Sequence, residues 1–186
     1  MRCSGMRRCF PNMFIHCTDT CAIMAATRCG HTNMYHYFGI EEYSRDWSRE
    51  MLSWKNHHNS IVVLRNPLDR VVSAMLHYSL WRPNNEGERE YFFVYHSSPY
   101  MSRMLSGCNF RIIDFYDLDQ YIPRRTDVFQ SPVTYSRVDE TAKVEDVYVQ
   151  NSDYTLEELQ QEVDIYKKLM VSCERVSVEE WKELTQ

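Results

Sequence analysis

The sequence predicts an α/β protein in which helices flank a central, mainly parallel sheet. Three apolar runs without polar alternation are bounded by polar residues, at Cys21–Thr27, Ser60–Asn66 and Phe110–Phe115. Runs of this kind are typical of strands that are covered on both faces, as in parallel sheets. Helix signals lie between and after these runs, and a chain that alternates strand and helix in this way favours a layered α/β domain.

The length of 186 residues suits a single domain, 1–186, that can bury a core. Its 13 Tyr, 8 Phe and 4 Trp argue against a disordered chain. Residues 1–12 are predicted to be a loose N-terminal arm. Residues 123–153 read as a long irregular segment, and because such segments in compact domains often serve a function, we treat this one as a candidate lid.

The first apolar run leads into a turn and a helix, in the sequence TRCGHTNMYHYF from Thr27 to Phe38. Gly30 lies in the turn, and Thr32 and Asn33 are suited to start the helix. The N–H groups at a helix N-terminus, together with a forked donor such as Arg28, favour phosphate or sulfate. The GxxxxGK[ST] sequence of nucleotide kinases is absent, and the alternative is that this segment is only a turn.

The second apolar run ends at Arg65 and continues into another predicted helix. Asn66 can cap this helix and Pro67 can occupy its first position. Apolar residues then recur at the spacing of one helical face, at Leu68, Val71, Val72, Met75 and Leu76. Polar residues share the opposite face, namely Asn66, Arg70, Ser73 and His77.

We expect Arg65 to bind a second anion. A guanidinium at the end of a buried strand is costly unless an anion or a carboxylate meets it. Ser73, on the polar face of the following helix, is expected to converge with Arg65 on one phosphate. The alternative is a structural pairing of Arg65 with Asp69 or Asp114. Both anion sites would lie at the carboxyl ends of strands, where open α/β sheets bind ligands.

Further helices are predicted in the second half of the chain. Residues 91–105 favour a helix that is interrupted near Pro99. Thr155 with Glu158, and Ser177 with Glu180, have the spacing of capping boxes. The helix that starts at Thr155 is predicted to bury one stripe of side chains, formed by Leu156, Leu159, Val163, Tyr166 and Met170.

Charge and hydropathy narrow the classes of partner. The net charge of −5 weighs against nucleic acid, because domains that grip polyanions are usually basic. We find no apolar run of the ~18–20 residues that span a membrane, and no apolar stretch typical of a signal peptide at the N-terminus. The sequence therefore predicts a protein that contacts neither nucleic acid nor membrane.

Because the sequence shows no secretory signal, we expect a cytoplasmic protein whose seven cysteines are reduced thiols. Five of them fall within the first 29 residues. The alternative use is a zinc site formed by Cys9, His16, Cys17 and Cys21, which has no CxxC pair to support it. We therefore expect no metal.

Taken together, the two anion-binding segments resemble the sulfotransferase superfamily. Members of that family have a strand, a loop such as P-K-x-G-T-T and a helix, and later a strand that ends in R-[ND]-P-x-[DE]-R-x-x-S. This chain has TRCGHTN and RNPLDRVVS in these places. In the second segment six residues match the pattern in step: Arg65, Asn66, Pro67, Asp69, Arg70 and Ser73.

The first segment departs from the family pattern at two positions. Arg28 stands where most members have lysine, although tyrosylprotein sulfotransferases also have arginine there, and His31 replaces a threonine. The resemblance covers Cys21–Tyr78 and extends more loosely to Arg111–Ile122, which is similar to a strand and short helix of carbohydrate sulfotransferases. The C-terminal R-K-G segment of cytosolic members is missing.

The resemblance implies a three-layer fold like that of P-loop nucleotide kinases and the donor 3′-phosphoadenosine-5′-phosphosulfate (PAPS). It implies that Arg65 and Ser73 hold the 3′-phosphate. Lys143 lies in the long irregular segment and is a candidate to close over the nucleotide, the alternative being a solvated lysine in a charged loop. Fixed cationic side chains can neutralise the charge of the transition state, so no metal is required. The 5′-side phosphosulfate would lie on the loop formed by Arg28, Cys29, Gly30, His31, Thr32 and Asn33, with Arg28 also acting in catalysis beside the leaving oxygen.

A hydroxyl or amine acceptor, such as a carbohydrate or small metabolite, also needs a general base. His96 follows an aromatic run and is the first choice, and Glu41 or Glu42 are the alternatives. Two other readings of the chain remain open at this point. One is a nucleotide or small-metabolite kinase with an unusual phosphate loop, and the other is a degenerate member that binds the nucleotide without transferring sulfate.

Overall fold

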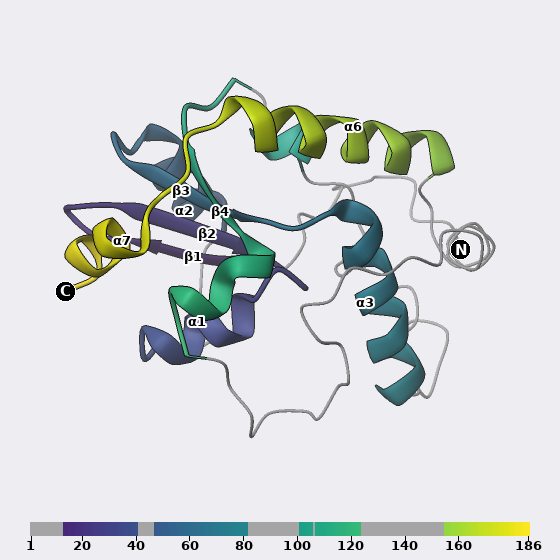
Figure 1. Cartoon of the computed structure of the whole chain (residues 1–186), viewed down its shortest axis with the longest axis horizontal. Helices are drawn as coiled ribbons and strands as arrows, with labels where there is room; N and C mark the ends of the chain where they lie inside the picture. Colours follow the sequence, from purple (N-terminus) through teal and green to yellow (C-terminus); the bar gives the residue numbers. More distant parts are fainter. Residues whose placement is uncertain (1–12, 41–46, 82–100, 106, 124–154) are drawn as a thin grey trace.

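The computed structural model describes residues 13–40, 47–81, 101–105, 107–123 and 155–186 (Figure 1). Its centre is a four-stranded sheet in the order β1-β2-β3-β4. The last three strands are parallel to one another, and the first pairs antiparallel with the second. The α/β class with a mostly parallel sheet is thus confirmed. The strands are β1 (Met13–Cys17), β2 (Ala22–Ala26), β3 (Ser60–Leu64) and β4 (Arg111–Asp114).

The three predicted apolar runs form β2, β3 and β4. Side chains alternate between the two faces of the sheet, and both faces are covered, which explains why the runs show no polar alternation. β1 was not predicted, because its short sequence MFIHC follows directly on the expected N-terminal arm. This strand is an edge of the sheet and turns into β2 through residues 18–21, where the Thr18 amide donates to the Cys21 carbonyl.

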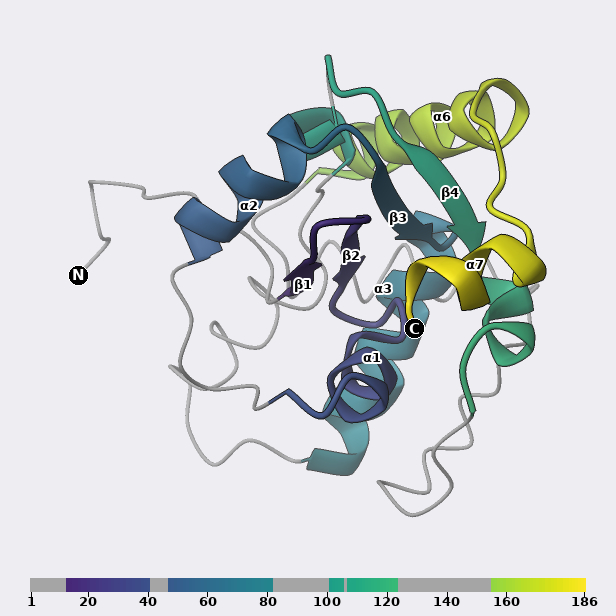
Figure 2. The ribbon, with the colours of Figure 1, turned by 90° about the vertical axis from the view of Figure 1, so that its left-hand side faces the viewer.

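Helices pack on both faces of the sheet (Figures 1 and 2). One face is covered by α2 (Trp47–Asn56), by the short π-helix η1 (Met101–Leu105) and by α6 (Leu156–Ser172). The other face is covered by α1 (His31–Tyr37), by the 3₁₀ helix η2 (Phe115–Gln120) and by α7 (Val178–Leu184). Each face has its own apolar cluster, and the fully buried Trp54 and Trp181 lie in opposite ones.

The helix predicted after β3 is α3 (Pro67–Trp81). As expected, the Asn66 side chain caps it by accepting a hydrogen bond from the Leu68 amide at 3.0 Å. Two residues of its polar face, Arg70 and Ser73, are buried, and each is 2% exposed. Their burial results from the packing of the start of α3 against the turn after β2, which is described below.

The capping signals near the C-terminus are also confirmed. Thr155 and Glu158 form a reciprocal capping box at the start of α6, and Ser177 accepts from the Glu180 amide at the start of α7. The buried stripe of α6 differs from the prediction, because Leu156 is exposed and Glu162 is buried. The Glu162 carboxylate is buried because it accepts three hydrogen bonds from the first residues of η1.

The C-terminal segment also covers an edge of the sheet. Ile112 of β4 donates to the Glu174 carbonyl at 2.9 Å and accepts from the Val176 amide at 3.0 Å. This short parallel pairing occupies backbone groups that an open strand edge would expose. None of the described helices has the length and apolar character needed to cross a membrane. The predicted N-terminal arm, most of the predicted helix at 91–105 and most of the candidate lid lie outside the described residues.

Candidate anion site at the carboxyl edge of the sheet

Parallel pairing brings the ends of β2, β3 and β4 to one edge of the sheet. Leu64 lies opposite Asp114 in the register of β3 and β4, so the next residues, Arg65 and Phe115, are neighbours. Ala25 lies opposite Val63, which places the turn after β2 beside the end of β3. The two segments expected to bind anions therefore meet at this edge, as the position of their strands predicted.

The turn after β2 is held in an unusual backbone conformation. Arg28 has a φ of 66°, in the left-handed region that non-glycine residues seldom adopt, and Gly30 has a φ of 85°. Gly30 is also tightly packed, because a Cβ at this position would lie 2.4 Å from Leu118 Cδ2. Gly30 is the N-cap of α1, which begins at His31, before the expected start at Thr32 and Asn33.

Arg65 is buried against the same turn. Its side chain is 2% exposed, and its Nη1 donates to the carbonyl oxygen of Arg28 at 2.7 Å. Its Cζ lies 4.4 Å from the centroid of the Phe115 ring, which gives a cation–π contact. In the described part of the chain, Nε and Nη2 of Arg65 have no hydrogen-bond partner, although both are shielded from solvent. A buried cation is thus left with two unused donors.

Two residues of α3 contact the turn as well. Arg28 Nε donates to Ser73 Oγ at 3.3 Å, and Arg70 Nη1 donates to the Thr27 carbonyl at 3.4 Å. Arg65 and Ser73 therefore contact Arg28, and Arg70 contacts Thr27. The contact between Arg28 and Ser73 brings the two expected anion sites into one cluster.

This cluster places the positively charged side chains of Arg28 and Arg65 close together where they are shielded from solvent. Burial, and then the positive charge of Arg65, lower the pKa of Arg28 to about 10, against a smaller opposing effect of Cys29. Burial also lowers the pKa of Arg65, and Cys29, Tyr116 and Asp69 oppose that shift. Both shifts mean that the protonated guanidiniums are less stable here than in water, so a bound anion would relieve a cost that the ligand-free chain carries.

The alternative, a direct ion pair of Arg65 with Asp69 or Asp114, is not present in the part of the chain that the structure describes, although the charge of Asp69 favours the protonated form of Arg65 and so opposes the lowering of its pKa. Asp69 Oδ2 accepts a hydrogen bond from the Tyr116 hydroxyl, and burial and this contact raise the pKa of Tyr116. Asp114 accepts from the Tyr116 amide at 3.1 Å and lies 3.9 Å from Arg175. Among the described residues, no ion pair joins Arg65 to either carboxylate.

The other residues predicted for this site are placed as follows. Cys29 is fully buried, and its amide donates to the Ala26 carbonyl at 2.9 Å. His31 is 9% exposed and meets the Tyr35 ring edge-on, while Thr32 and Asn33 are half-buried in the first turn of α1. Four predicted residues lie outside the residues that the structure describes, namely Glu41, Glu42, His96 and Lys143.

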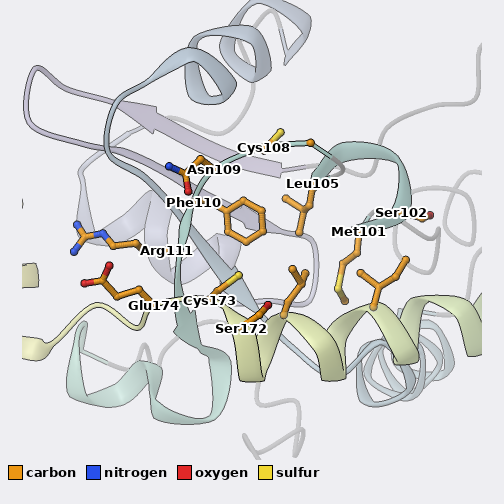
Figure 3. Close-up of a pocket in the computed structure, with 13 residues that line it drawn as sticks. Met101, Ser102, Leu105, Cys108, Asn109, Phe110, Arg111, Ser172, Cys173 and Glu174 are labelled. Atoms are coloured by element: carbon orange, nitrogen blue, oxygen red, sulfur yellow. The ribbon is translucent and has the colours of Figure 1, made fainter.

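A cavity of about 670 Å³ lies at a different place, between η1, the start of β4 and the C-terminal half of α6 (Figure 3). Arg111 is the first residue of β4, so this cavity is at the amino end of that strand, whereas Arg65 follows the carboxyl end of β3. None of the predicted site residues that the structure describes lines it. Its walls are formed by Met101, Ser102, Leu105, Gly107, Cys108, Asn109, Phe110, Arg111, Ile165, Leu169, Ser172, Cys173 and Glu174.

The described cysteines and histidines do not form a metal site. No group of three or more His, Cys, Asp or Glu side chains in the described ranges is arranged to hold an ion. Cys9, one of the four residues of the zinc alternative, lies outside those ranges. The five cysteines that the structure describes, at 17, 21, 29, 108 and 173, are not in disulfides.

Sequence reasoning missed the contribution of Phe115 to this site. A signal existed in the run FRIIDF, because the strand 111–114 ends immediately before Phe115. The order of strands in the sheet, which decides that Phe115 follows the neighbour of β3, cannot be read from a single sequence.

Comparisons of the chain with protein-family models, with curated proteins and with solved structures found no match. The function is therefore inferred from the contacts of the chain's own residues.

Proposed function

We propose that the protein is a sulfotransferase that binds PAPS at the carboxyl edge of the sheet and moves its sulfuryl group to a hydroxyl or amine acceptor. The observation that supports this most is Arg65, a buried cation with two unused donors beside a second cationic side chain, Arg28. Such a pair is costly without a bound anion. The proposal assigns the chain to the sulfotransferase superfamily and its sheet to the three-layer, P-loop nucleotide-kinase-like fold.

The local structure of the second segment supports this proposal. The strand β3 ends at Leu64, Arg65 turns toward Arg28, Asn66 caps α3, and Ser73 lies two turns into that helix. Arg65, Asn66 and Ser73 of RNPLDRVVS therefore each have a structural reason for their place. The proposed role of Arg65 and Ser73 is to donate hydrogen bonds to the 3′-phosphate of the nucleotide, because forked and hydroxyl donors suit its oxygens.

The proposed reaction is an in-line displacement at sulfur. The acceptor oxygen or nitrogen forms a bond to sulfur while the bond from sulfur to the bridging phosphate oxygen breaks, and 3′-phosphoadenosine 5′-phosphate (PAP) leaves. The acceptor proton passes to a general base, for which His96, then Glu41 or Glu42, stay predictions. Charge that develops on the bridging oxygen needs hydrogen-bond donors, and the turn 28–33 with Thr32 is the proposed source.

Calorimetric titration with PAP, 5′-AMP and ATP tests the proposal. We expect PAP to bind at least about tenfold more tightly than 5′-AMP, because the 3′-phosphate adds charge-assisted hydrogen bonds. ATP, which has no 3′-phosphate, should bind no better than 5′-AMP. Tighter binding of ATP than of PAP would favour a kinase instead.

Transfer of labelled sulfate from PAPS to a panel of carbohydrates, phenols and amines then separates an enzyme from a binding protein. Transfer that depends on Arg65 supports the proposal. Tight binding of PAP without transfer to any acceptor, and without release of labelled sulfate to water, would contradict catalysis and support the degenerate, nucleotide-binding reading.

A further inference from the structure

The cavity at the amino end of β4 is large enough to hold a small organic molecule. Its volume is about 670 Å³, within the range of roughly 300–1,000 Å³ that is typical of ligand pockets. η1 and the start of β4 face the C-terminal half of α6 across it (Figure 3). None of the described residues of the proposed nucleotide site lines this cavity, so a ligand here would bind at a second, separate site.

The walls of the cavity are mainly apolar. Met101, Leu105 and Phe110 form one wall, and α6 contributes Ile165 and Leu169 to the other (Figure 3). The first three are buried in the apolar cluster on this face of the sheet, and the two residues of α6 pack against that cluster while partly exposed. Removal of such apolar surface from water favours binding. The walls therefore favour a ligand with an apolar body.

One end of the cavity carries a net negative charge. Glu174 and Arg111 both lie at this end (Figure 3). Arg111 pairs with Glu180 and donates to Asn59, whereas Glu174 makes no ion pair in the described part of the chain. The next residue, Arg175, lies 3.9 Å from each of two other carboxylates. One arginine and two glutamates therefore leave this end of the cavity negative.

The C-terminal end of α6 adds to this negative charge. The helix ends at Ser172, and Ser172, Cys173 and Glu174 all line the cavity. The last carbonyls of a helix have no partner within it and attract cations. Of these carbonyls in α6, the structure shows a backbone bond from beyond the helix only to Leu169, from the Cys173 amide at 2.9 Å, and the last turn has no basic residue. A cation from outside the chain would take the place of the missing basic side chain.

We propose that this cavity binds a small molecule with an apolar body and a protonated amino group. The amino group lies at the end formed by Glu174 and the last turn of α6, and the body lies against Leu105 and Phe110. A neutral alcohol of the same size gains the apolar contacts without the attraction of charge, and a carboxylate is repelled. The inference does not rest on the proposed function, because the two sites share no described residue.

Calorimetric titration at pH 7 with n-octylamine, n-octanol and octanoate tests the class of ligand. The three probes have the same alkyl chain, and at this pH the amine is protonated and octanoate is ionised. Each is used below the concentration at which it forms micelles. We expect octylamine to bind about fivefold more tightly than octanol, because a helix end and a partly exposed carboxylate each contribute modestly, and octanoate to bind most weakly. Equal affinity for amine and alcohol, tightest binding of octanoate, or no binding of octylamine would overturn the inference.

Two thiols on the walls report where octylamine binds. Cys108 and Cys173 are partly exposed free thiols that line the cavity, and Cys17, at the end of β1, is an exposed free thiol that does not. Saturating octylamine should slow the alkylation of Cys108 and Cys173 by iodoacetamide severalfold and leave Cys17 unchanged, as measured by mass spectrometry of peptides. An amine bound as an acceptor at the carboxyl edge of the sheet would not cover these thiols. Unchanged rates at both cavity thiols, or equal slowing of all three, would overturn the inference.

Glu174→Gln tests the negative end of the cavity. Because Glu174 is exposed, we expect the variant to unfold in urea as wild type does, to lose about threefold in octylamine affinity and to keep its octanol affinity. Glu157→Gln makes the same change of charge at an exposed residue in the first turn of α6, and is the matched control with no change expected. Wild-type preference for the amine in Glu174→Gln, or an equal loss in Glu157→Gln, would overturn the inference.

Discussion

Glu162 and Arg65 are both almost fully buried, in different regions of the protein. Other residues supply hydrogen-bond partners for the Glu162 carboxylate, but for only one nitrogen of the Arg65 guanidinium. Glu162 is 1% exposed on α6 and accepts hydrogen bonds from the Met101 amide at 2.7 Å, the Ser102 amide at 2.9 Å and Ser102 Oγ at 2.5 Å. Arg65 is 2% exposed at the end of β3, and two of its three nitrogens have no hydrogen-bond partner among the described residues.

The difference indicates two kinds of buried charge. Glu162 fixes η1 to α6, and its charge is compensated by donors that the fold itself supplies, so it is a structural group. Arg65 donates to one carbonyl oxygen and lies against an aromatic ring, and the effects of Cys29, Tyr116 and Asp69 on its pKa are smaller than the effect of its burial. A charge that the fold leaves incompletely compensated at a sheet edge where ligands bind is better explained by a ligand.

The largest expected effect on stability is at Glu162. In Glu162→Gln, an uncharged amide of the same size faces donors of Met101 and Ser102, and one of its ends is itself a donor. We expect the free energy of unfolding in urea to fall by about 2–3 kcal/mol, because hydrogen bonds to a buried charge are lost. The affinity for PAP should not change. If this variant were as stable as wild type, Glu162 would not be a structural group and the contrast with Arg65 would fail.

The next effect is a dependence of nucleotide affinity on pH. Arg28 has a pKa lowered to about 10, so its charge is present below that pH and is lost as the pH rises through it. The phosphate is already a dianion there, and binding must then return the proton to Arg28. We expect the affinity for PAP to fall up to about tenfold between pH 10 and pH 11.

Arg28→Gly is the control for this measurement, because lysines and tyrosines ionise in the same range. Its affinity should be weaker at pH 8 and should show a smaller fall between pH 10 and pH 11. If PAP affinity falls by the same factor in both proteins between pH 10 and pH 11, other groups cause the pH dependence and Arg28 does not contribute to it.

The smallest expected effect is at Arg111, an arginine at the opposite end of the sheet. Its side chain pairs with Glu180 and donates from Nη2 to Asn59 Oδ1 at 2.6 Å, and it is partly exposed. We expect Arg111→Ala to lower the free energy of unfolding by about 1 kcal/mol, since partly exposed pairs contribute little. A tenfold loss of PAP affinity in this variant would show that affinity does not depend specifically on the arginines at the carboxyl edge of the sheet.

Local signals in the sequence predicted much of the fold. The apolar runs gave β2, β3 and β4, and the Asn66 cap and the Thr155–Glu158 box marked the starts of α3 and α6. These elements were predictable because apolar runs and caps depend on neighbouring residues. The edge strand β1 was not, because it is short and its pairing with β2 is tertiary.

The arginines and the serine of the candidate site were predictable from the sequence, but Phe115 and the contacts among these residues were not. The sequence identified Arg28, Arg65 and Ser73, and it left open whether Arg65 pairs with a carboxylate. That question depends on the register of β3 and β4, which places Phe115 beside Arg65 while Asp69 binds Tyr116. The buried Glu162 was missed for a similar reason, since its partners are on η1, about 60 residues away in sequence.

The most direct test of the central claim, that Arg65 is compensated by a ligand, is to measure PAP affinity and urea unfolding on one Arg65→Met variant. Methionine removes the guanidinium and keeps much of the volume. We predict that affinity falls about 10- to 100-fold, since charge-assisted bonds are worth roughly 1.5–3 kcal/mol, while the empty protein changes by less than about 1 kcal/mol or gains stability. A loss of ~3 kcal/mol or more with unchanged affinity would contradict the claim and make Arg65 a structural residue like Glu162.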